Sequence, residues 1–408
     1  MIASWRFWWI WLSLVALYMS SGCQPSDGTS PKKNSTVAVQ QASPMVTPSN
    51  WPLFRGDACS TGVSQGELPS SLALQWKVEI ENGAFESTAA VVDGVIFIGD
   101  LDGRLLALRL DDGQELWRKE LQDQLGFVGS PAVKNGRVFV GDMDGSFYCF
   151  DATNGDLKWT FATQAEINSS ANFYQNNVLV GSQDATLYCL NAESGELVWK
   201  HQIEDQVRCT PTIVESRTFL VGCDAKLHTI DLNSGESLDA VELDGPSGTT
   251  PAVQGDYAYF GTHGGRFYCV DWRQGEVAWT FKDAEDSQSF HGSAAVTSSV
   301  VVIGSRNRRV YGLNPANGEQ MWTFIAKRGV DSSPVIVGDR VFVGSSDGRL
   351  YGLDVLTGEE VWSYEAGGRI VASPAIADGC LIIANDDGKV FCFGHNVRTG
   401  SLAGMESG

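Results

Sequence analysis

The chain has 408 residues, of which 43% are hydrophobic, and a formal net charge of −20. This amount of apolar material is enough for a large core and excludes a mainly disordered protein. The excess of acidic residues argues against a general nucleic-acid-binding protein, which needs clustered Lys and Arg to face phosphates.

Residues 1–22 have the pattern of a lipoprotein-type signal peptide. Arg6 precedes an apolar run that is too short to span a membrane comfortably, and small residues follow it. The segment that ends at Cys23 resembles a bacterial lipobox, with Ser20 where an aliphatic residue is typical. We therefore predict export and lipidation of Cys23. Cleavage at an ordinary secretory site nearby and a short N-terminal anchor are the alternatives.

Residues 23–50 are predicted to form a disordered tether behind the lipid anchor. The segment is rich in Gln, Ser, Thr and Pro and has no apolar periodicity, so it cannot bury enough surface to offset its chain entropy. Gln24 replaces the Asp that holds enterobacterial lipoproteins at the inner membrane, which favours the outer membrane, facing the periplasm. Residues 396–408 are predicted to be a flexible tail.

A repeat of 40 to 43 residues runs through residues 51–395. Each copy has a turn glycine, and these are Gly113, Gly155, Gly195, Gly235, Gly275, Gly318 and Gly358. A Trp follows four residues later in six copies and once upstream, at Trp76, Trp117, Trp159, Trp199, Trp279, Trp322 and Trp362. We expect these side chains to dock each blade on the next. Asp239 stands at this position in the fourth copy, so that junction is either compensated elsewhere or soft.

Each copy reads as four short strands separated by Gly-containing turns. The first strand recurs eight times, whereas the fourth strand follows it only seven times, and the strand around Trp76 fits the gap. The sequence therefore predicts an all-β fold with a single eight-bladed β-propeller of four-stranded antiparallel blades. The last blade is expected to take its fourth strand from the N-terminal side, which closes the ring without a disulfide.

A candidate binding ring comes from the position two residues before a recurring Ser or Thr in strand one. Alternation places this position opposite an apolar series, so it is expected to face the channel mouth. Five of its eight members are polar and chemically distinct: Glu86, Asn168, Arg208, His291 and Asp331. They indicate recognition of a small ligand or an extended peptide. A wet channel lined by residues that water tolerates is the alternative.

The other polar features are weaker signals. Arg306 to Arg309 places three cations in one hairpin, which is either a docking spot for an acidic partner or a solvated turn. Cys209 and Cys223 lie on adjacent predicted strands, where a disulfide is one outcome. The cysteines at the small-residue position of the repeat are expected to be buried as small hydrophobes, and these are Cys149, Cys189, Cys269 and Cys392.

Two copies of the repeat, residues 269–279 (CVDWRQGEVAW) and 352–362 (GLDVLTGEEVW), resemble the tryptophan-docking repeat of pyrroloquinoline quinone dehydrogenases and their non-enzymatic relatives. A lipobox before a single propeller is similar to the BamB family of envelope scaffold lipoproteins. That resemblance implies a non-catalytic role in the assembly of outer-membrane β-barrel proteins, through protein–protein contacts with the barrel-assembly machinery.

The dehydrogenases with this repeat use two adjacent cysteines, a Trp below the cofactor, Ca²⁺ ligands and an Asp base. No two cysteines are adjacent in this sequence, and it contains no Cys-x-x-Cys-His haem motif. The sequence therefore predicts a protein that is not an enzyme and has no cofactor and no metal site. A quinone-dependent dehydrogenase is kept as a third hypothesis.

Overall fold

The computed structural model describes residues 49–121 and 125–395, which contain strands and turns. Within these ranges no helix is long and apolar enough to cross a membrane. The predicted signal peptide, the lipidation site Cys23, the tether up to residue 48 and the tail from residue 396 lie outside the described residues.

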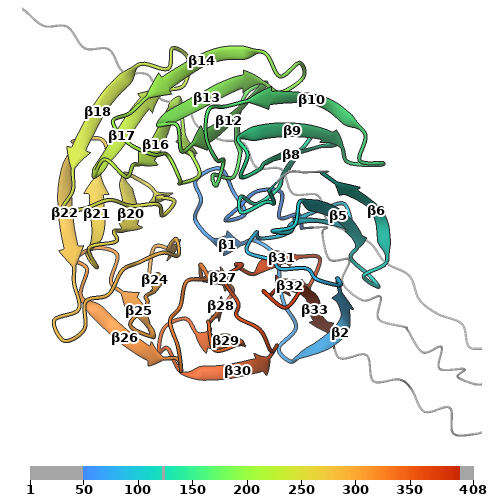
Figure 1. Cartoon of the computed structure of the whole chain (residues 1–408). Helices are drawn as coiled ribbons and strands as arrows, with labels where there is room; N and C mark the ends of the chain where they lie inside the picture. Colours follow the sequence, from blue (N-terminus) through green and yellow to red (C-terminus); the bar gives the residue numbers. More distant parts are fainter. Residues whose placement is uncertain (1–48, 122–124, 396–408) are drawn as a thin grey trace, which may run out of the picture. The chain divides into compact units, whose positions relative to one another are not determined.

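The described strands form eight four-stranded blades arranged in a ring (Figure 1). Blade 1 consists of β3 (Ala90–Val92), β4 (Val95–Gly99), β5 (Arg104–Arg109) and β6 (Glu115–Glu120). Blade 2 consists of β7 (Ala132–Lys134), β8 (Arg137–Gly141), β9 (Ser146–Asp151) and β10 (Leu157–Ala162). Blade 3 consists of β11 (Asn172–Tyr174), β12 (Asn177–Ser182), β13 (Thr186–Asn191) and β14 (Leu197–Gln202). Blade 4 consists of β15 (Thr212–Val214), β16 (Arg217–Val221), β17 (Lys226–Asp231) and β18 (Ser237–Glu242). Blade 5 consists of β19 (Ala252–Gln254), β20 (Tyr257–Gly261), β21 (Phe267–Asp271) and β22 (Glu276–Phe281).

Blades 6 to 8 complete the ring. Blade 6 consists of β23 (Ala295–Val296), β24 (Val301–Gly304), β25 (Arg309–Leu313) and β26 (Gln320–Ile325). Blade 7 consists of β27 (Val335–Val337), β28 (Arg340–Gly344), β29 (Arg349–Asp354) and β30 (Glu360–Glu365). Blade 8 consists of β31 (Ala375–Ala377), β32 (Cys380–Ala384), β33 (Lys389–His395) and β2 (Leu72–Glu79). The eight-bladed all-β architecture predicted from the repeat is confirmed.

The ring is closed in blade 8, where the N-terminal strand β2 pairs antiparallel with the C-terminal strand β33. Trp76 lies opposite Cys392 in this register. The predicted closure is therefore present, and it joins the two ends of the propeller through backbone hydrogen bonds. The described cysteines are all free thiols.

The blades are sandwiched between neighbours, which explains their residue patterns. The two middle strands of each blade are buried on both faces, as in β28, whose last four residues are all buried. The outermost strand alternates between exposed and partly buried positions, as in β14, because one of its faces is open to solvent. Strand sequences that look uniformly apolar thus lie in the middle of the blades.

A cyclic chain of eight hydrogen bonds links the segments that lead into the first strand of each blade; the residues of this cycle were predicted within strand one, but the strands begin two residues after them. In each bond a backbone N–H of one blade donates to the side-chain hydroxyl of the next blade, as Ser130 N–H does to Ser170 Oγ at 2.8 Å. The cycle ends with Ser373 N–H, which donates to Thr88 Oγ1 at 3.0 Å. The participants are Thr88, Ser130, Ser170, Thr210, Thr250, Ser293, Ser333 and Ser373. All are buried.

A segment ahead of the first blade, residues 49–64 (here the base segment), closes one end of the ring. Strand-one backbone N–H groups donate to its carbonyls in blades 1, 2 and 4 to 7, among them Val133 to Pro52 at 2.8 Å and Ile336 to Gly62 at 2.9 Å. Its last residues form β1 (Val63–Ser64), which pairs parallel with β27 and lies at the centre of the ring (Figure 1). The sequence did not predict this cover.

Arg55 anchors the base segment inside the ring. Its side chain is buried, and Nη2 donates to Ala294 O at 2.8 Å and to Pro334 O at 2.6 Å, which ties it to blades 6 and 7. Burial lowers the pKa of this guanidinium to about 9.

Each Trp of the internal repeat contacts the following blade around the ring. The indole Nε1–H of Trp159 donates to Ala192 O at 3.3 Å, and a Cβ on Gly195 would lie 2.6 Å from the same ring. Glycine is needed there both for this close approach and for its φ of 75°. The same indole bond is made by Trp76, Trp117, Trp199, Trp279, Trp322 and Trp362. Of these seven residues only Trp322 is buried, so the others gain less from burial than a core Trp.

The junction between blades 4 and 5 is rebuilt around a different Trp. Asp239 is exposed and lies against Gly275. Trp272 of blade 5 instead reaches back to blade 4, where its ring lies 5.3 Å from that of Phe219 in an edge-to-face contact. Its exposed fraction is 5%, and its Nε1–H donates to Gly255 O at 3.0 Å. The missing docking residue is therefore compensated.

Replacing this compensating side chain should cost as much as removing a core aromatic. We expect Trp272→Ala to lower the free energy of unfolding by about 3–4 kcal/mol, because the cavity lies in a packed cluster. Urea unfolding followed by fluorescence measures it, with Leu356→Ala, at an exposed turn, as a control expected to change stability by about 0.5 kcal/mol or less. A loss below about 1 kcal/mol in Trp272→Ala would contradict this account of the junction.

Candidate functional site

A cavity of about 250 Å³ lies inside the ring and is lined by residues from all eight blades. Its wall contains all eight strand-one positions that the sequence places at the mouth: Glu86, Val128, Asn168, Arg208, Gly248, His291, Asp331 and Val371. The eight hydroxyl residues of the hydrogen-bond cycle line it as well, and Phe54 of the base segment contributes to its lining. We call this cavity the mouth pocket.

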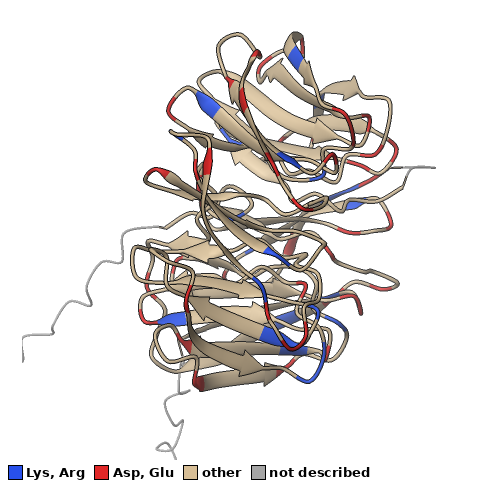
Figure 2. Cartoon of the chain, turned by 90° about the vertical axis from the view of Figure 1, so that its left-hand side faces the viewer, with Lys and Arg blue, Asp and Glu red and all other residues tan. Residues whose placement is uncertain are grey.

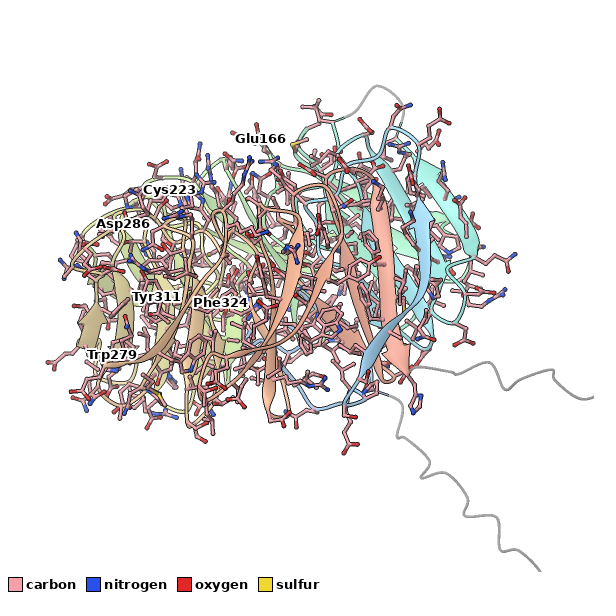
Figure 3. The ribbon with its side chains drawn as sticks, turned by 90° about the horizontal axis from the view of Figure 1, so that it is seen from below. Glu166, Cys223, Trp279, Asp286, Tyr311 and Phe324 are labelled. Atoms are coloured by element: carbon pink, nitrogen blue, oxygen red, sulfur yellow. The ribbon has the colours of Figure 1, made fainter. Side chains whose placement is uncertain are left out.

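The extended segment ahead of each first strand explains why these side chains gather. The residues that alternate with them are buried between blades, with exposed fractions of 0–2%: Phe85, Phe127, Ile167, Val207, Phe290, Val330 and Ile370. Since neighbouring residues of an extended chain point in opposite directions, burying this series turns the other toward the axis. The loops around the pocket form one rim of the ring, where Figure 3 shows Glu166, Cys223 and Asp286, with Trp279 toward the opposite rim.

The charged residues around the mouth differ in how they are partnered. Asp331 accepts two hydrogen bonds from Arg306, at 2.9 Å to Nε and 3.3 Å to Nη2, so its charge is neutralised. On the other side of the mouth Arg369 pairs with Asp386 at 2.7 Å. These two pairs leave Arg208 and Glu86 as the ring charges that lack an ion-pair partner among the described residues.

Two histidines from neighbouring blades stack at the pocket wall. The rings of His263 and His291 are 4.7 Å apart and nearly parallel, and His291 Nε2 lies 3.0 Å from Ser289 Oγ. Burial, and then the Arg306 cation, lower the pKa of His291 to about 4, and Asp331 opposes this shift. Burial, followed by the charges of Arg208 and Arg306, also lowers the pKa of His263. The pair is therefore neutral at neutral pH.

Two pocket residues were missed by the sequence reasoning. His263 comes from the turn between β20 and β21 rather than from strand one, and Phe54 comes from the base segment. No periodic signal marks either residue: Phe54 follows the apolar Leu53, and His263 stands in a Gly-containing turn. Neither position belongs to the strand-one series from which the ring was predicted.

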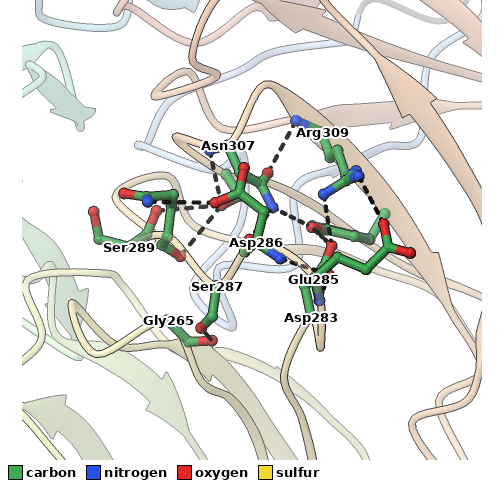
Figure 4. Close-up of polar contacts among 11 residues, drawn as sticks. Gly265, Asp283, Glu285, Asp286, Ser287, Ser289, Asn307 and Arg309 are labelled. Atoms are coloured by element: carbon green, nitrogen blue, oxygen red, sulfur yellow. Dashed lines mark hydrogen bonds and ion pairs between the residues drawn. The ribbon is translucent and has the colours of Figure 1, made fainter.

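The cationic hairpin of blade 6 is largely committed within the chain. Arg306 pairs with Asp331, and Arg309 pairs with Asp283 at 3.1 Å and with Glu285 at 3.4 Å. Figure 4 shows the contacts of Arg309 with Asp283 and Glu285, and beside them the buried Asn307, which donates to Asp286 O at 2.6 Å. Two of the three cations thus link loops of neighbouring blades, which weakens the hypothesis of an acidic docking partner at this hairpin, whereas Arg308 has no ion-pair partner among the described residues.

The cysteines behave as packing residues. Cys209 and Cys223 are free thiols, so the disulfide considered from the sequence is not formed in this structure. Cys149, Cys189, Cys269 and Cys392 are buried in the blades, as expected for the small-residue position. Burial raises the pKa of Cys149 to about 11 and that of Cys189 to about 12, which keeps these thiols protonated at neutral pH. The described residues contain no group of three or more potential metal ligands.

These features define a closed eight-bladed propeller of the quinoprotein-like type with a blind pocket at one mouth. The sequence model described as "Outer membrane protein assembly factor BamB" matches residues 70–173, 163–289 and 268–407. The chain belongs to this family. No curated protein matches the sequence significantly.

Solved structures share the fold at low sequence identity. BamB from Moraxella catarrhalis has a TM-score of 0.68 and 18% identity, over 80% of this chain and 100% of that one. Quinohemoprotein alcohol dehydrogenase from Comamonas testosteroni has a TM-score of 0.71 and 15% identity, over 88% and 82%. A europium-containing methanol dehydrogenase has a TM-score of 0.71 and 12% identity, over 85% and 98%. At these identities the likeness shows the fold alone, and it includes both scaffold and enzyme.

The mouth pocket does not fit the set of residues that the dehydrogenase resemblance implies. Neither Cys nor Trp is among the described residues that line it, and its aspartate, Asp331, is held by Arg306. We derive no oxidoreductase step from these residues.

The depressed pKa of His291 gives a pH dependence of stability. An unfolded His titrates near ~6.5, whereas the folded one resists protonation down to about 4. As the pH falls through this window the unfolded state takes up the proton, so stability is lost; above it the contribution is complete. The groups facing His291 are His263, Arg306, Asp331 and Ser289.

We therefore expect His291→Gln to flatten the loss of unfolding free energy between pH 6.5 and 4.5 by about 1 kcal/mol, after allowance for solvent screening. Urea unfolding at a series of pH values measures this. His395→Gln, at the exposed end of β33, is the control and should keep the wild-type slope. Identical slopes for His291→Gln and the wild type would show that this histidine does not resist protonation.

Proposed function

We propose that the chain is a non-catalytic scaffold lipoprotein of the cell envelope, anchored through Cys23, that supports the assembly of outer-membrane β-barrel proteins. The observation that carries the proposal is its membership of the BamB family, whose model matches segments from every blade. A closed ring with short loops suits this role, because it can hold a docking surface rigid without any moving part.

We place the docking surface on the rim around the mouth. The opposite end is covered by the base segment, which accepts backbone hydrogen bonds from seven blades. The mouth rim instead carries solvent-exposed loops with charges, such as that of Asp205, that lack ion-pair partners among the residues which the structure describes. Figure 2 shows Asp and Glu spread over the loops and strands of the blades rather than gathered in one patch. A partner that meets this rim would present basic or polar groups to it.

Crosslinking in whole cells followed by pull-down from detergent-solubilised envelopes tests the scaffold role. We expect the wild-type protein to recover the barrel-forming subunit of the assembly machinery, and deletion of the protein to lower the levels of outer-membrane β-barrel proteins. Asp205→Arg, on the mouth rim, should reduce recovery. Glu276→Arg, on the outer strand β22, is the matched charge reversal and should not. Unchanged barrel levels in the deletion strain would contradict the role.

The lipid anchor is tested separately. Cys23→Ala should abolish labelling by radioactive palmitate and move the protein from the membrane to the soluble periplasmic fraction, because one thiol carries the anchor. Labelling that persists in Cys23→Ala would place the modification at another residue.

A second candidate function is the binding of a small ligand or extended peptide in the mouth pocket. The observation that favours it is the asymmetry of the wall: equivalent positions of a repeating fold carry Glu, Asn, Arg, His and Asp around one cavity. Packing of the ring does not require this variety, since Gly and Val occupy the remaining positions.

A further inference from the structure

Two opposite charges face the mouth pocket, and neither has an ion-pair partner among the described residues. Arg208 is held in place by neutral groups only: its Nε donates to Gln206 Oε1 at 2.9 Å, and its Nη2 donates to Gln183 Oε1 at 3.1 Å. Glu86 makes no hydrogen bond or ion pair within the described residues, although Arg369, paired with Asp386, is near enough to feel its charge. The pocket thus has an unpaired positive charge beside blade 4 and an unpaired negative charge beside blade 1.

The hydroxyl cycle gives the pocket a ring of spare donors. Each Ser or Thr oxygen of the cycle accepts one backbone N–H, and a hydroxyl also has a proton of its own to donate. All eight hydroxyl residues line the pocket. Oxygen acceptors, above all those of a carboxylate, match such donors best.

One acceptor in the wall is also left without a donor. The buried Oδ1 of Asn168 receives no hydrogen bond from the described residues. An unsatisfied buried acceptor costs free energy unless a ligand or water supplies the proton. The wall therefore complements a ligand that has acceptor oxygens and at least one N–H donor.

The size of the cavity limits the occupant. Its volume of about 250 Å³ lies below the range of ~300–1,000 Å³ that is typical of sites for drug-sized ligands. Phe54 of the base segment is part of its lining. A small solute fits this space, whereas a folded partner does not enter it.

We infer that the mouth pocket binds a small zwitterion of the amino-acid or dipeptide class. Its carboxylate would lie at Arg208 and the hydroxyl ring, and its ammonium group at Glu86. The inference deepens the pocket-binding function proposed above and rests on it, and it is independent of the scaffold role. Asp331 takes no part in this recognition, because Arg306 already satisfies its charge.

Isothermal titration calorimetry of the folded chain with L-alanyl-L-alanine and two charge-edited analogues tests the inference. L-Alanyl-L-alaninamide lacks the carboxylate, and N-acetyl-L-alanyl-L-alanine lacks the ammonium group. We expect each analogue to bind about tenfold or more weakly than the dipeptide, since a hydrogen bond to a charged group contributes about 1.5–3 kcal/mol.

Two variants assign the ends of the ligand. Arg208→Gln should remove the preference for the free carboxylate while the preference for the ammonium group remains, and Glu86→Gln should do the reverse. Arg118→Gln and Glu120→Gln, on the outer strand β6, are the matched controls and should bind as the wild type does. Thermal unfolding of each variant shows that it is folded.

The outcomes separate this inference from the other proposals. Binding of all three compounds with equal affinity would leave a pocket that binds ligands but overturn the zwitterion assignment. The absence of any binding at millimolar concentration would overturn both. Neither result touches the scaffold role, which is measured by recovery of the barrel-forming subunit.

Discussion

The closed cycle of hydroxyl-to-amide hydrogen bonds is the constraint on which the rest of the propeller depends. Because Ser373 donates to Thr88, every blade is held by a bond on each side and no blade is terminal. The bonds are buried, so breaking one leaves a donor and an acceptor unsatisfied. The cycle fixes the depth of strand one in every blade. It thereby places the residue two positions before each hydroxyl residue at the mouth. The residue three positions after each hydroxyl residue is placed at the base segment.

Variation is tolerated where it does not touch this cycle. Blade 4 has lost the docking Trp, yet Trp272 supplies an aromatic contact to Phe219 from the neighbouring blade, and the hydroxyl bond from Thr210 to Thr250 is unchanged at 3.0 Å. The wall of the mouth pocket varies even more freely, from Gly248 to Arg208, because these side chains point into open space. A rigid repeating frame with a non-repeating mouth is what a binding platform requires, and it explains how one fold serves both scaffolds and enzymes.

The sequence predicted the frame well because its signals are local and repeated. The spacing of glycines and tryptophans gave the number of blades, the unmatched strand around Trp76 gave the closure, and period-two alternation placed Glu86 and Arg208 at the mouth. What it missed depends on contacts between residues far apart in the chain. The base segment accepts hydrogen bonds from all eight blades, and Asp331 forms an ion pair with Arg306 of the preceding blade; neither contact leaves a periodic trace in the sequence. The tether and lipidation site lie outside the described residues and remain predictions.

Residue-resolved amide hydrogen exchange tests the central claim, that one closed cycle holds the ring, most directly. The account predicts that the amides of the cycle exchange only through global unfolding, with the same free energy of opening at Ser373, where the ring closes, as at Ser130, in its middle. Faster exchange at Ser373 and in β2, with a lower free energy of opening than at Ser130, would show that blade 8 opens by itself. The blades would then unfold in separate steps, with blade 8 first, rather than as a single cooperative unit.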